Sequence, residues 1–142
     1  MHFAFVDRVI EQSDTSITTL KAVTLAEEYL QDHFKGFEVL PGVFMLESLV
    51  QAARHLLTSI DPAHARWVLA EAKAVRYGSF VRPGETLRCH IELQSRDDSN
   101  ASFKARAVVL EQDSSERVCV TGRFSLRPAK PLDAPARVHS SA

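Results

Sequence analysis

The sequence has almost none of the features that tie a chain to a metal or to an oxidising compartment. Only two of its 142 residues are cysteines, and no CxxC or Cys/His spacing surrounds either of them. Neither a zinc site nor a disulfide framework is therefore expected. Cys89 and Cys119 stand alone on candidate strands, which is typical of reduced structural thiols. We expect a cytoplasmic protein with no metal and no cofactor.

The chain also lacks a charge excess and a long hydrophobic run. Its formal net charge is −1 and no block of like charges appears, which argues against nucleic acid or an anionic membrane as a partner. The opening "MHFAFVDRVIEQ" has neither a basic region nor a continuous apolar run, so we expect no signal peptide. The longest apolar-rich stretch, residues 39–57, is interrupted by polar residues and a proline, so we expect no membrane span.

The composition that is present suits one globular domain. The hydrophobic fraction is 45% and the charged fraction is 25%, which is ordinary for a folded chain of this length. After Arg127 the sequence "PAKPLDAPARVHSSA" is rich in proline and poor in large apolar residues. We expect a single domain over residues 1–127 and a disordered tail over residues 128–142.

The hydrophobic pattern predicts six strands and one long helix. From Gly42 to about Ser59, apolar residues beginning with Val43 recur at helical spacing, and the helix is apolar nearly all round, which indicates burial. Strands are predicted over residues 1–12, 15–25, 66–75, 85–95, 103–111 and 117–126. This order favours an α+β fold in which a curved antiparallel sheet is wrapped around one long central helix.

Alternation also assigns the buried faces of three strands. The residues expected inside are Leu87, Cys89, Ile91 and Leu93, then Phe103, Ala105, Ala107 and Val109, then Val118, Val120, Phe124 and Leu126. The links between these strands are short and polar, which favours antiparallel hairpins.

Glu47 is a single carboxylate inside the apolar helix. No Lys or Arg lies one helical turn away on its face, whereas Gln51 does. Burial without a cation favours the neutral carboxyl, which can donate a proton in catalysis, and Gln51 could orient it by a hydrogen bond. The alternative is that Glu47 reaches solvent or a partner on another strand or subunit.

Two further groups precede or begin the helix. His33 carries an imidazole that can take up a proton near neutral pH, although a loop histidine without a role is the alternative. At Pro41-Gly42 the helix begins, and its unpaired N–H groups can hold an oxygen that becomes negative during a reaction, although plain capping is the alternative. Base, oxyanion donor and acid together favour removal of a proton alpha to a thioester carbonyl with loss of a beta hydroxyl.

The stretch "HFKGFEVLPGVFMLESLVQAA" resembles the signature of the beta-hydroxyacyl-acyl-carrier-protein dehydratases of type II fatty-acid synthesis. The matching positions are His33, Phe34, Gly36, Pro41, Gly42, Val43, Glu47 and Gln51. The resemblance extends to "FVDRV" at 5–9, "KAVT" at 21–24 and "VRPGETL" at 81–87, and it covers roughly residues 3–127.

The resemblance implies the hot-dog fold and a dehydratase acting on (3R)-hydroxyacyl thioesters of acyl carrier protein. His33 would be the base on the C2 proton and Glu47 would protonate the departing C3 hydroxyl. The substrate would be bound by Gly42, Val43, Phe44, Gln51 and Tyr77, with the Gly42 amide on the thioester oxygen. It further implies a homodimer in which His33 of one subunit faces Glu47 of the other. Some members of the family assemble into trimers of dimers.

The chain departs from the family pattern at two places. Lys35 and Glu38 replace prolines in the loop that carries His33, and "YGSFVRPG" replaces a more basic turn, so Gly78 stands where the family often has a basic residue. The alternatives are a hot-dog acyl thioesterase, which would need Glu47 ionised, and a non-catalytic acyl-binding subunit.

Overall fold

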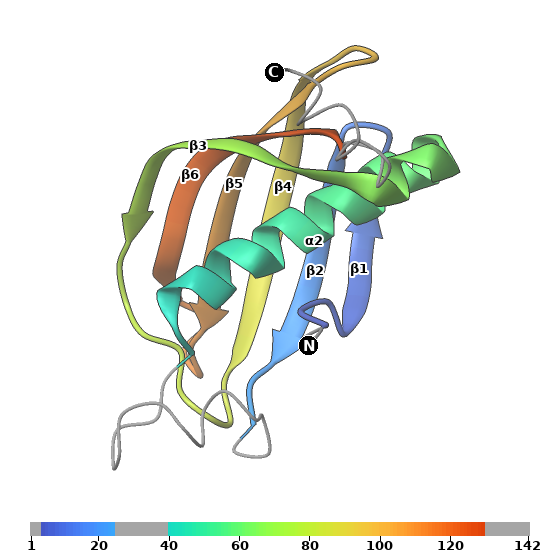
Figure 1. The fold of residues 1–142 in the computed structure, drawn as a ribbon. Coiled ribbons are helices and arrows are strands. Elements are labelled where there is room, and N and C mark those ends of the chain that lie inside the picture. The colour runs from blue at the N-terminus through green and yellow to red at the C-terminus, as the bar shows by residue number, and fades with distance from the viewer. Residues whose placement is uncertain (1–3, 25–39, 130–142) are drawn as a thin grey trace.

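The computed structural model describes residues 4–24 and 40–129, which form an antiparallel sheet and one long helix (Figure 1). The strands are β1 (Arg8–Gln12), β2 (Ser16–Ala22), β3 (Trp67–Tyr77), β4 (Thr86–Arg96), β5 (Ala101–Leu110) and β6 (Glu116–Pro128). The helix is α2 (Gly42–Ile60), followed by the 3-10 turn η1 (Pro62–Arg66). The strand order is β1-β2-β4-β5-β6-β3 with every neighbouring pair antiparallel. The predicted α+β class and hot-dog architecture are confirmed.

The helix lies across one face of the curved sheet (Figure 1). Its buried residues are Met45, Ser48, Leu49, Val50, Ala52, Ala53, Leu56 and Leu57, which lie on the side that faces the strands. They form one core with the inward side chains of β2, β4, β5 and β6. The sheet covers one side of α2 and leaves part of the helix surface open in the single chain, where Val43 is 65% exposed. Within the described ranges, no helix combines the length and the apolar character needed to cross a bilayer.

The predicted inward faces of β4 and β5 are confirmed, and that of β6 is wrong at one residue. Val120, Phe124 and Leu126 are buried, but Val118 is 36% exposed. The pairing of β5 with β6 shifts between Ala107 and Val108, which leaves Cys119 as an extra residue on β6. Such a bulge reverses the alternation beyond it, so Val118 lies on the outer face while Cys119 and Val120 are both buried.

The first strand begins later than alternation predicts, at Arg8 rather than near residue 1. The preceding segment, residues 4–7, contacts β2 through Asp7 without forming a strand. Asp7 accepts a hydrogen bond from the Ala22 amide through Oδ2 (2.7 Å), and its own amide donates to the Leu20 carbonyl (2.8 Å). The helical turn expected near residues 26–30 and the loop around them lie outside the described residues, as do residues 130–142 of the tail expected over 128–142. Pro128 is the last residue of β6.

His64 closes the C-terminal end of α2. Its Nδ1 lies 2.9 Å from the Leu57 carbonyl oxygen and 3.0 Å from that of Asp61. Because carbonyl oxygens only accept, Nδ1 must carry the proton and donate to both. The ring is buried and packs edge-on against Trp67 with centroids 4.6 Å apart. These carbonyls also accept main-chain amides, Leu57 from Asp61 and Asp61 from His64 (both 3.0 Å), so the His64 ring adds a second donor to each of them.

We expect His64→Ala to lower the free energy of unfolding by about 2 kcal/mol, because two carbonyls lose their side-chain donor and Trp67 loses a ring contact. Urea denaturation monitored by Trp67 fluorescence would measure this. The matched control is His55→Ala, whose exposed side chain lies in the last turns of α2; we expect it to change stability by less than about 0.5 kcal/mol. Equal effects of the two substitutions would contradict the capping role.

The two thiols lie in the core between the sheet and α2. Cys89 and Cys119 are both fully buried and unpaired. Burial raises the pKa of the Cys89 thiol to about 12, and it also raises the pKa of Cys119. Both groups are therefore neutral thiols at physiological pH, which excludes them as nucleophiles in the folded protein.

In the folded protein at pH 8, neither Cys89 nor Cys119 should react with a disulfide reagent such as 5,5′-dithiobis(2-nitrobenzoate). The reactive species is the thiolate, which a raised pKa and burial both suppress. Denaturation in guanidinium should release two reactive thiols per chain. Rapid modification of either cysteine before unfolding would show that the core is open there.

Candidate active site

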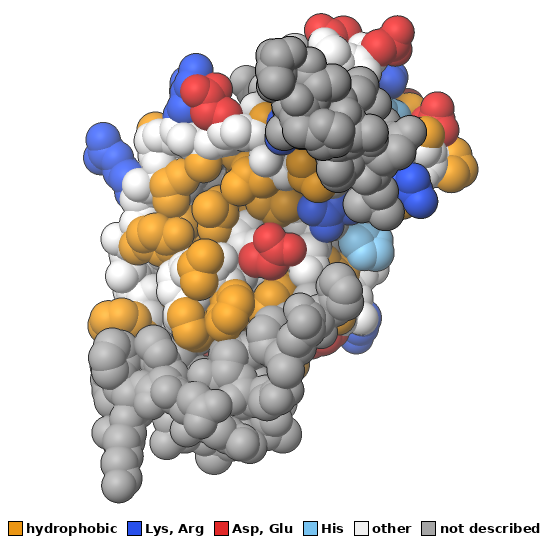
Figure 2. All heavy atoms as spheres, in the orientation of Figure 1, with side chains coloured by type: hydrophobic (Ala, Val, Ile, Leu, Met, Phe, Trp, Pro, Cys, Tyr) orange, Lys and Arg blue, Asp and Glu red, His pale blue; other side chains and the backbone are white. Residues whose placement is uncertain are grey.

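The side of α2 that faces away from the sheet carries most of its polar residues. This open face consists of Val43, Glu47, Gln51, Arg54 and Thr58, which follow one another at three- and four-residue spacing. Figure 2 shows hydrophobic side chains gathered on this side of the molecule with an acidic side chain among them. Glu47 is half-buried rather than enclosed. The carboxyl therefore borders an apolar surface on the one side of the helix that the sheet leaves uncovered.

Glu47 is held by a hydrogen-bonded pair of contacts. Gln51, one turn later, donates from Nε2 to Glu47 Oε2 at 3.1 Å. The main-chain N–H of Phe5 donates to Gln51 Oε1 at 2.7 Å. The hydrogen bond expected between Gln51 and Glu47 is therefore present. The contribution of Phe5 could not be inferred from sequence, because a main-chain amide leaves no trace in residue type.

Gly42 is the first residue of α2 and lies directly beneath the ring of Tyr77. A Cβ placed on Gly42 would be 3.0 Å from Tyr77 Cε1 and 3.3 Å from Cδ1. Tyr77 ends β3 and is 51% exposed. Pro41 precedes the helix, and its carbonyl accepts the amides of Phe44 and Met45. The structure thus brings together the helix N-terminus and an aromatic side chain from the far edge of the sheet.

The loop over residues 78–85 fixes Tyr77 against the helix. The Leu40 amide donates to the Val81 carbonyl (2.8 Å), which joins the loop to the start of α2. Arg117 donates to the Phe80 carbonyl (3.0 Å) and to Glu85 (2.7 Å). Partial burial would raise the pKa of Glu85, but the hydrogen bonds from Arg117 and from the Arg82 amide hold it below its ordinary value. Glu85 therefore stays ionised and keeps the loop attached to β6.

Gly78 has a steric reason to be glycine. A Cβ at this position would lie 2.5 Å from the Val118 carbonyl oxygen, which is closer than real Cβ atoms approach a backbone atom. The Gly78 amide donates to the Cys119 carbonyl at 2.8 Å, so the backbone is pinned at that separation. The departure from the more basic family turn is thus coupled to the bulge in β6.

The remaining predicted binding residues take two different positions. Phe44 is partly buried, and its ring stacks on Phe5 with centroids 5.2 Å apart. Val43 projects from the open face instead. A hollow of about 220 Å³ runs along this face, lined by Gln51, Arg54, His55, Thr58 and Ala65. The predicted roles of Val43 and Phe44 in substrate binding stay predictions.

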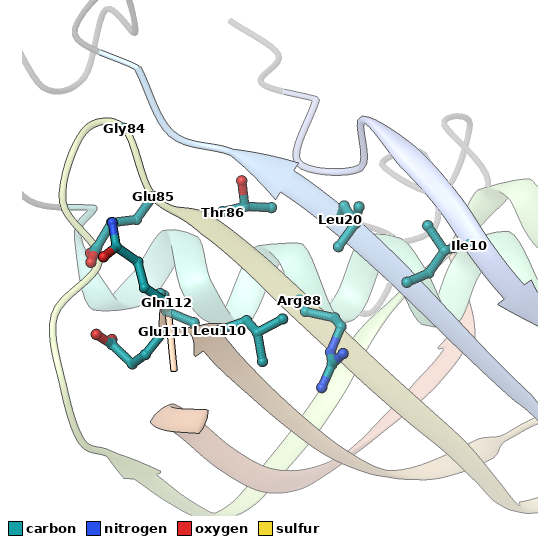
Figure 3. Close-up of a pocket in the computed structure, with 10 residues that line it drawn as sticks. Ile10, Leu20, Gly84, Glu85, Thr86, Arg88, Leu110, Glu111 and Gln112 are labelled. Carbon is teal, nitrogen blue, oxygen red and sulfur yellow. The ribbon is translucent and has the colours of Figure 1, made fainter. Parts of the chain in front are cut away.

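A larger hollow of about 640 Å³ lies on the outer face of the sheet, away from α2 (Figure 3). Ile10, Leu20 and Leu110 border it, and Arg88 points across it (Figure 3). Arg88 is already paired with Glu116. None of the predicted site residues lines this hollow, so we do not assign the reaction to it.

His33 lies outside the described residues, as do Lys35 and Glu38. The described part of the site therefore contains an oriented carboxyl, a helix N-terminus and an aromatic cover. No group of three or more His, Cys, Asp or Glu side chains with metal-binding geometry occurs within residues 4–24 and 40–129.

Comparison with known proteins places these features in a family context. Residues 9–123 match the family model described as "ApeI-like: ApeI dehydratase". The 3-hydroxyacyl-[acyl-carrier-protein] dehydratase FabZ of Lactococcus lactis subsp. cremoris is 39% identical over 108 residues, which is 75% of each chain.

Two solved structures share the fold. The dehydratase heterocomplex ApeI:P from Xenorhabdus doucetiae superposes with a TM-score of 0.73 at 20% identity, covering 95% of this chain and 89% of that one. Thioesterase superfamily member 2 from Mus musculus gives a TM-score of 0.64 at 12% identity, covering 86% and 81%. At these identities the two structures support the fold only. The type of reaction is indicated by the family model and by the relatives of higher sequence identity.

Proposed function

The chain belongs to the ApeI-like dehydratase family, and on this premise we propose how its residues carry out the reaction. The enzyme is a hydro-lyase that converts a (3R)-3-hydroxyacyl thioester of acyl carrier protein into the trans-2-enoyl thioester, in fatty-acid or related lipid biosynthesis. The observation that carries the mechanism is the half-buried carboxyl of Glu47, oriented by Gln51 on an otherwise apolar helix face.

His33 removes the proton from C2, and the electron pair left behind forms the C2–C3 double bond. The C3–oxygen bond breaks as Glu47 gives its proton to the departing hydroxyl, which leaves as water. The negative charge that develops on the thioester oxygen is stabilised by the Gly42 amide at the N-terminus of α2. The proton gained by His33 equals the proton lost by Glu47, so proton return between the two groups resets the enzyme.

We propose that a second copy of the chain covers the open face of α2 and brings its His33 toward Glu47. A face that exposes Val43 beside a carboxyl suits a subunit interface better than water. Because the structure from Xenorhabdus doucetiae is a heterocomplex, a different chain as the covering subunit is the alternative.

The carrier protein docks beside Tyr77 in this proposal. Tyr77 and Phe80 are each about half exposed, and the exposed side chains of Arg76 and Arg82 lie next to them in sequence. Cationic groups around an apolar mouth suit an acidic carrier that delivers a thioester into the protein. We place the enzyme in the cytoplasm together with its carrier.

A thioesterase is the alternative with the same fold, since that fold also serves thioesterases such as the mouse protein. Hydrolysis would release a free thiol, whereas elimination keeps the thioester intact and forms a conjugated enoyl product. The "HFKG" histidine favours elimination, because hydrolysis by a carboxylate does not need it. An acyl-binding subunit would give neither product.

Mixing two inactive variants tests the shared site. We expect His33→Ala and Glu47→Gln each to lower kcat by about a hundredfold or more, which is typical of losing a general acid or base. When the two variants are unfolded together and refolded as a mixture, mixed dimers regain one intact site, so about a quarter of the sites should recover activity. The measurement is the ultraviolet absorbance of the conjugated enoyl thioester as it forms.

No recovery in the mixture would show that His33 and Glu47 act within one chain. Release of free thiol by the wild-type protein without enoyl product would replace the elimination by hydrolysis.

The contact between Gly42 and Tyr77 gives a second test. Gly42→Ala should lower kcat/KM about tenfold, because the new methyl group displaces the Tyr77 ring from the substrate entrance. In a Tyr77→Ala background, the same substitution should have little further effect, since the ring is gone. An equal loss in both backgrounds would mean that Gly42 is needed for its backbone alone.

A further inference from the structure

We propose that the segment formed by residues 4–7, ahead of β1, is a positioning element that determines which oxygen of Glu47 delivers the proton. The inference rests on the proposed function, because it takes Glu47 as the acid. It goes further by assigning the orientation of that acid to residues distant in sequence. The observation behind it is the pair of contacts that link Phe5 to Gln51 and Gln51 to Glu47.

The amide of Gln51 has its orientation fixed by the backbone. A main-chain N–H can only donate, so the Gln51 atom that lies 2.7 Å from Phe5 N must be the carbonyl oxygen. The NH₂ group then has to face Glu47, where it donates to Oε2 at 3.1 Å. An oxygen that accepts this bond is the poorer site for the acid proton. The proton is therefore carried by Oε1, and Oε1 is the atom that meets the leaving hydroxyl.

Two contacts hold the ring of Phe5. The side chain is 1% exposed and stacks on Phe44 of α2 with centroids 5.2 Å apart. Lys21 belongs to β2, and its ammonium lies 6.0 Å from the centroid of the Phe5 ring, within the range of a cation–π contact. Since Phe44 and Lys21 belong to the helix and the sheet, the Phe5 amide is fixed relative to both layers.

Asp7 ties the same segment to β2. Its amide donates to the Leu20 carbonyl (2.8 Å), its Oδ2 accepts from the Ala22 amide (2.7 Å), and its Oδ1 lies 3.7 Å from Lys21 Nζ. Lys21 is only 6% exposed, and the Asp7 carboxylate lies beside its ammonium. We call Phe5, Asp7, Lys21 and Phe44 the N-terminal clamp.

A positioning role differs from a purely structural one in its kinetics. If the clamp acts through Gln51 on a group that works in the transition state, its loss lowers kcat and leaves KM unchanged. Its loss should also have no further effect once Gln51 is gone, because the path to Glu47 is already broken. A clamp that merely stabilises the core would lower the melting temperature and would act equally in both backgrounds.

The experiment places Lys21→Met and Asp7→Ala in the wild-type chain and in a Gln51→Leu chain. In the wild-type background each should lower kcat about tenfold, the scale of a misplaced catalytic group, with KM unchanged. In the Gln51→Leu background neither should lower kcat further. The matched control is Arg106→Met, which removes an ion pair with Glu116 on the outer face of the sheet; its kcat should equal that of the parent chain.

Independent, multiplicative losses in the two backgrounds would overturn the proposal, as would losses in melting temperature with kcat intact. If Asp7→Ala fails to fold, Asp7→Asn is used instead, because it keeps an acceptor for the Ala22 amide and loses the charge. If Lys21→Met fails to fold, Lys21→Gln is used instead, because it keeps a polar side chain and loses the charge. Failure of the proposed function is separate: it would appear as full activity in Glu47→Gln, whatever the clamp variants do.

Discussion

The structure depends on the fact that a single sheet can cover only one side of a helix. Here the inward faces of the strands bury the apolar side of α2, from Met45 to Leu57. The opposite side has to carry residues that tolerate partial exposure or that meet another subunit. Glu47 and Gln51 lie on that side, so the layer arrangement that stabilises the core also leaves the acid at a boundary. A fold that enclosed the helix completely would leave no route for a substrate to reach the carboxyl.

Polar groups at this boundary are ordered by contacts that come from distant parts of the chain. The Gln51 amide is oriented by the backbone of Phe5, and Tyr77 is brought over Gly42 by the far edge of the sheet. Arg117 attaches the intervening loop through Phe80 and Glu85. Each contact joins elements widely separated in sequence, so the site is a product of the whole fold rather than of α2 alone. Preorganisation of this kind reduces the rearrangement needed when charge develops in a reaction.

Sequence patterns predicted the parts of this protein that depend on periodicity. The helix from Gly42, the inward residues of β4 and β5, and the spacing of Glu47 and Gln51 all follow from a repeat of two or of about four residues. The errors arose where periodicity is interrupted. Val118 was assigned to the core because a bulge leaves no signal in residue type. The start of β1 was placed too early because the apolar alternation in the sequence continues ahead of the residues that pair with β2.

The contacts at the candidate site were also predictable only where they follow from helical spacing. A hydrogen bond between residues one helical turn apart can be anticipated, whereas a donor supplied by the backbone of Phe5 cannot. The exposure of Val43 was missed because its hydrophobicity is the same whether it faces the core or another subunit. The hydrogen bond from Phe5 and the exposure of Val43 both depend on long-range packing, which cannot be read from a single sequence.

The bulge at Cys119 makes β6 sensitive to its length at one residue. Deleting that residue would remove the bulge and leave Val118 paired with Val108 on the outer face. It would also remove the Cys119 carbonyl that accepts the Gly78 amide and so holds the loop after Tyr77. The change would reach the contact between Tyr77 and Gly42 although neither residue had been altered. Chains related by descent should therefore tolerate substitutions at this point of the strand far more readily than insertions or deletions.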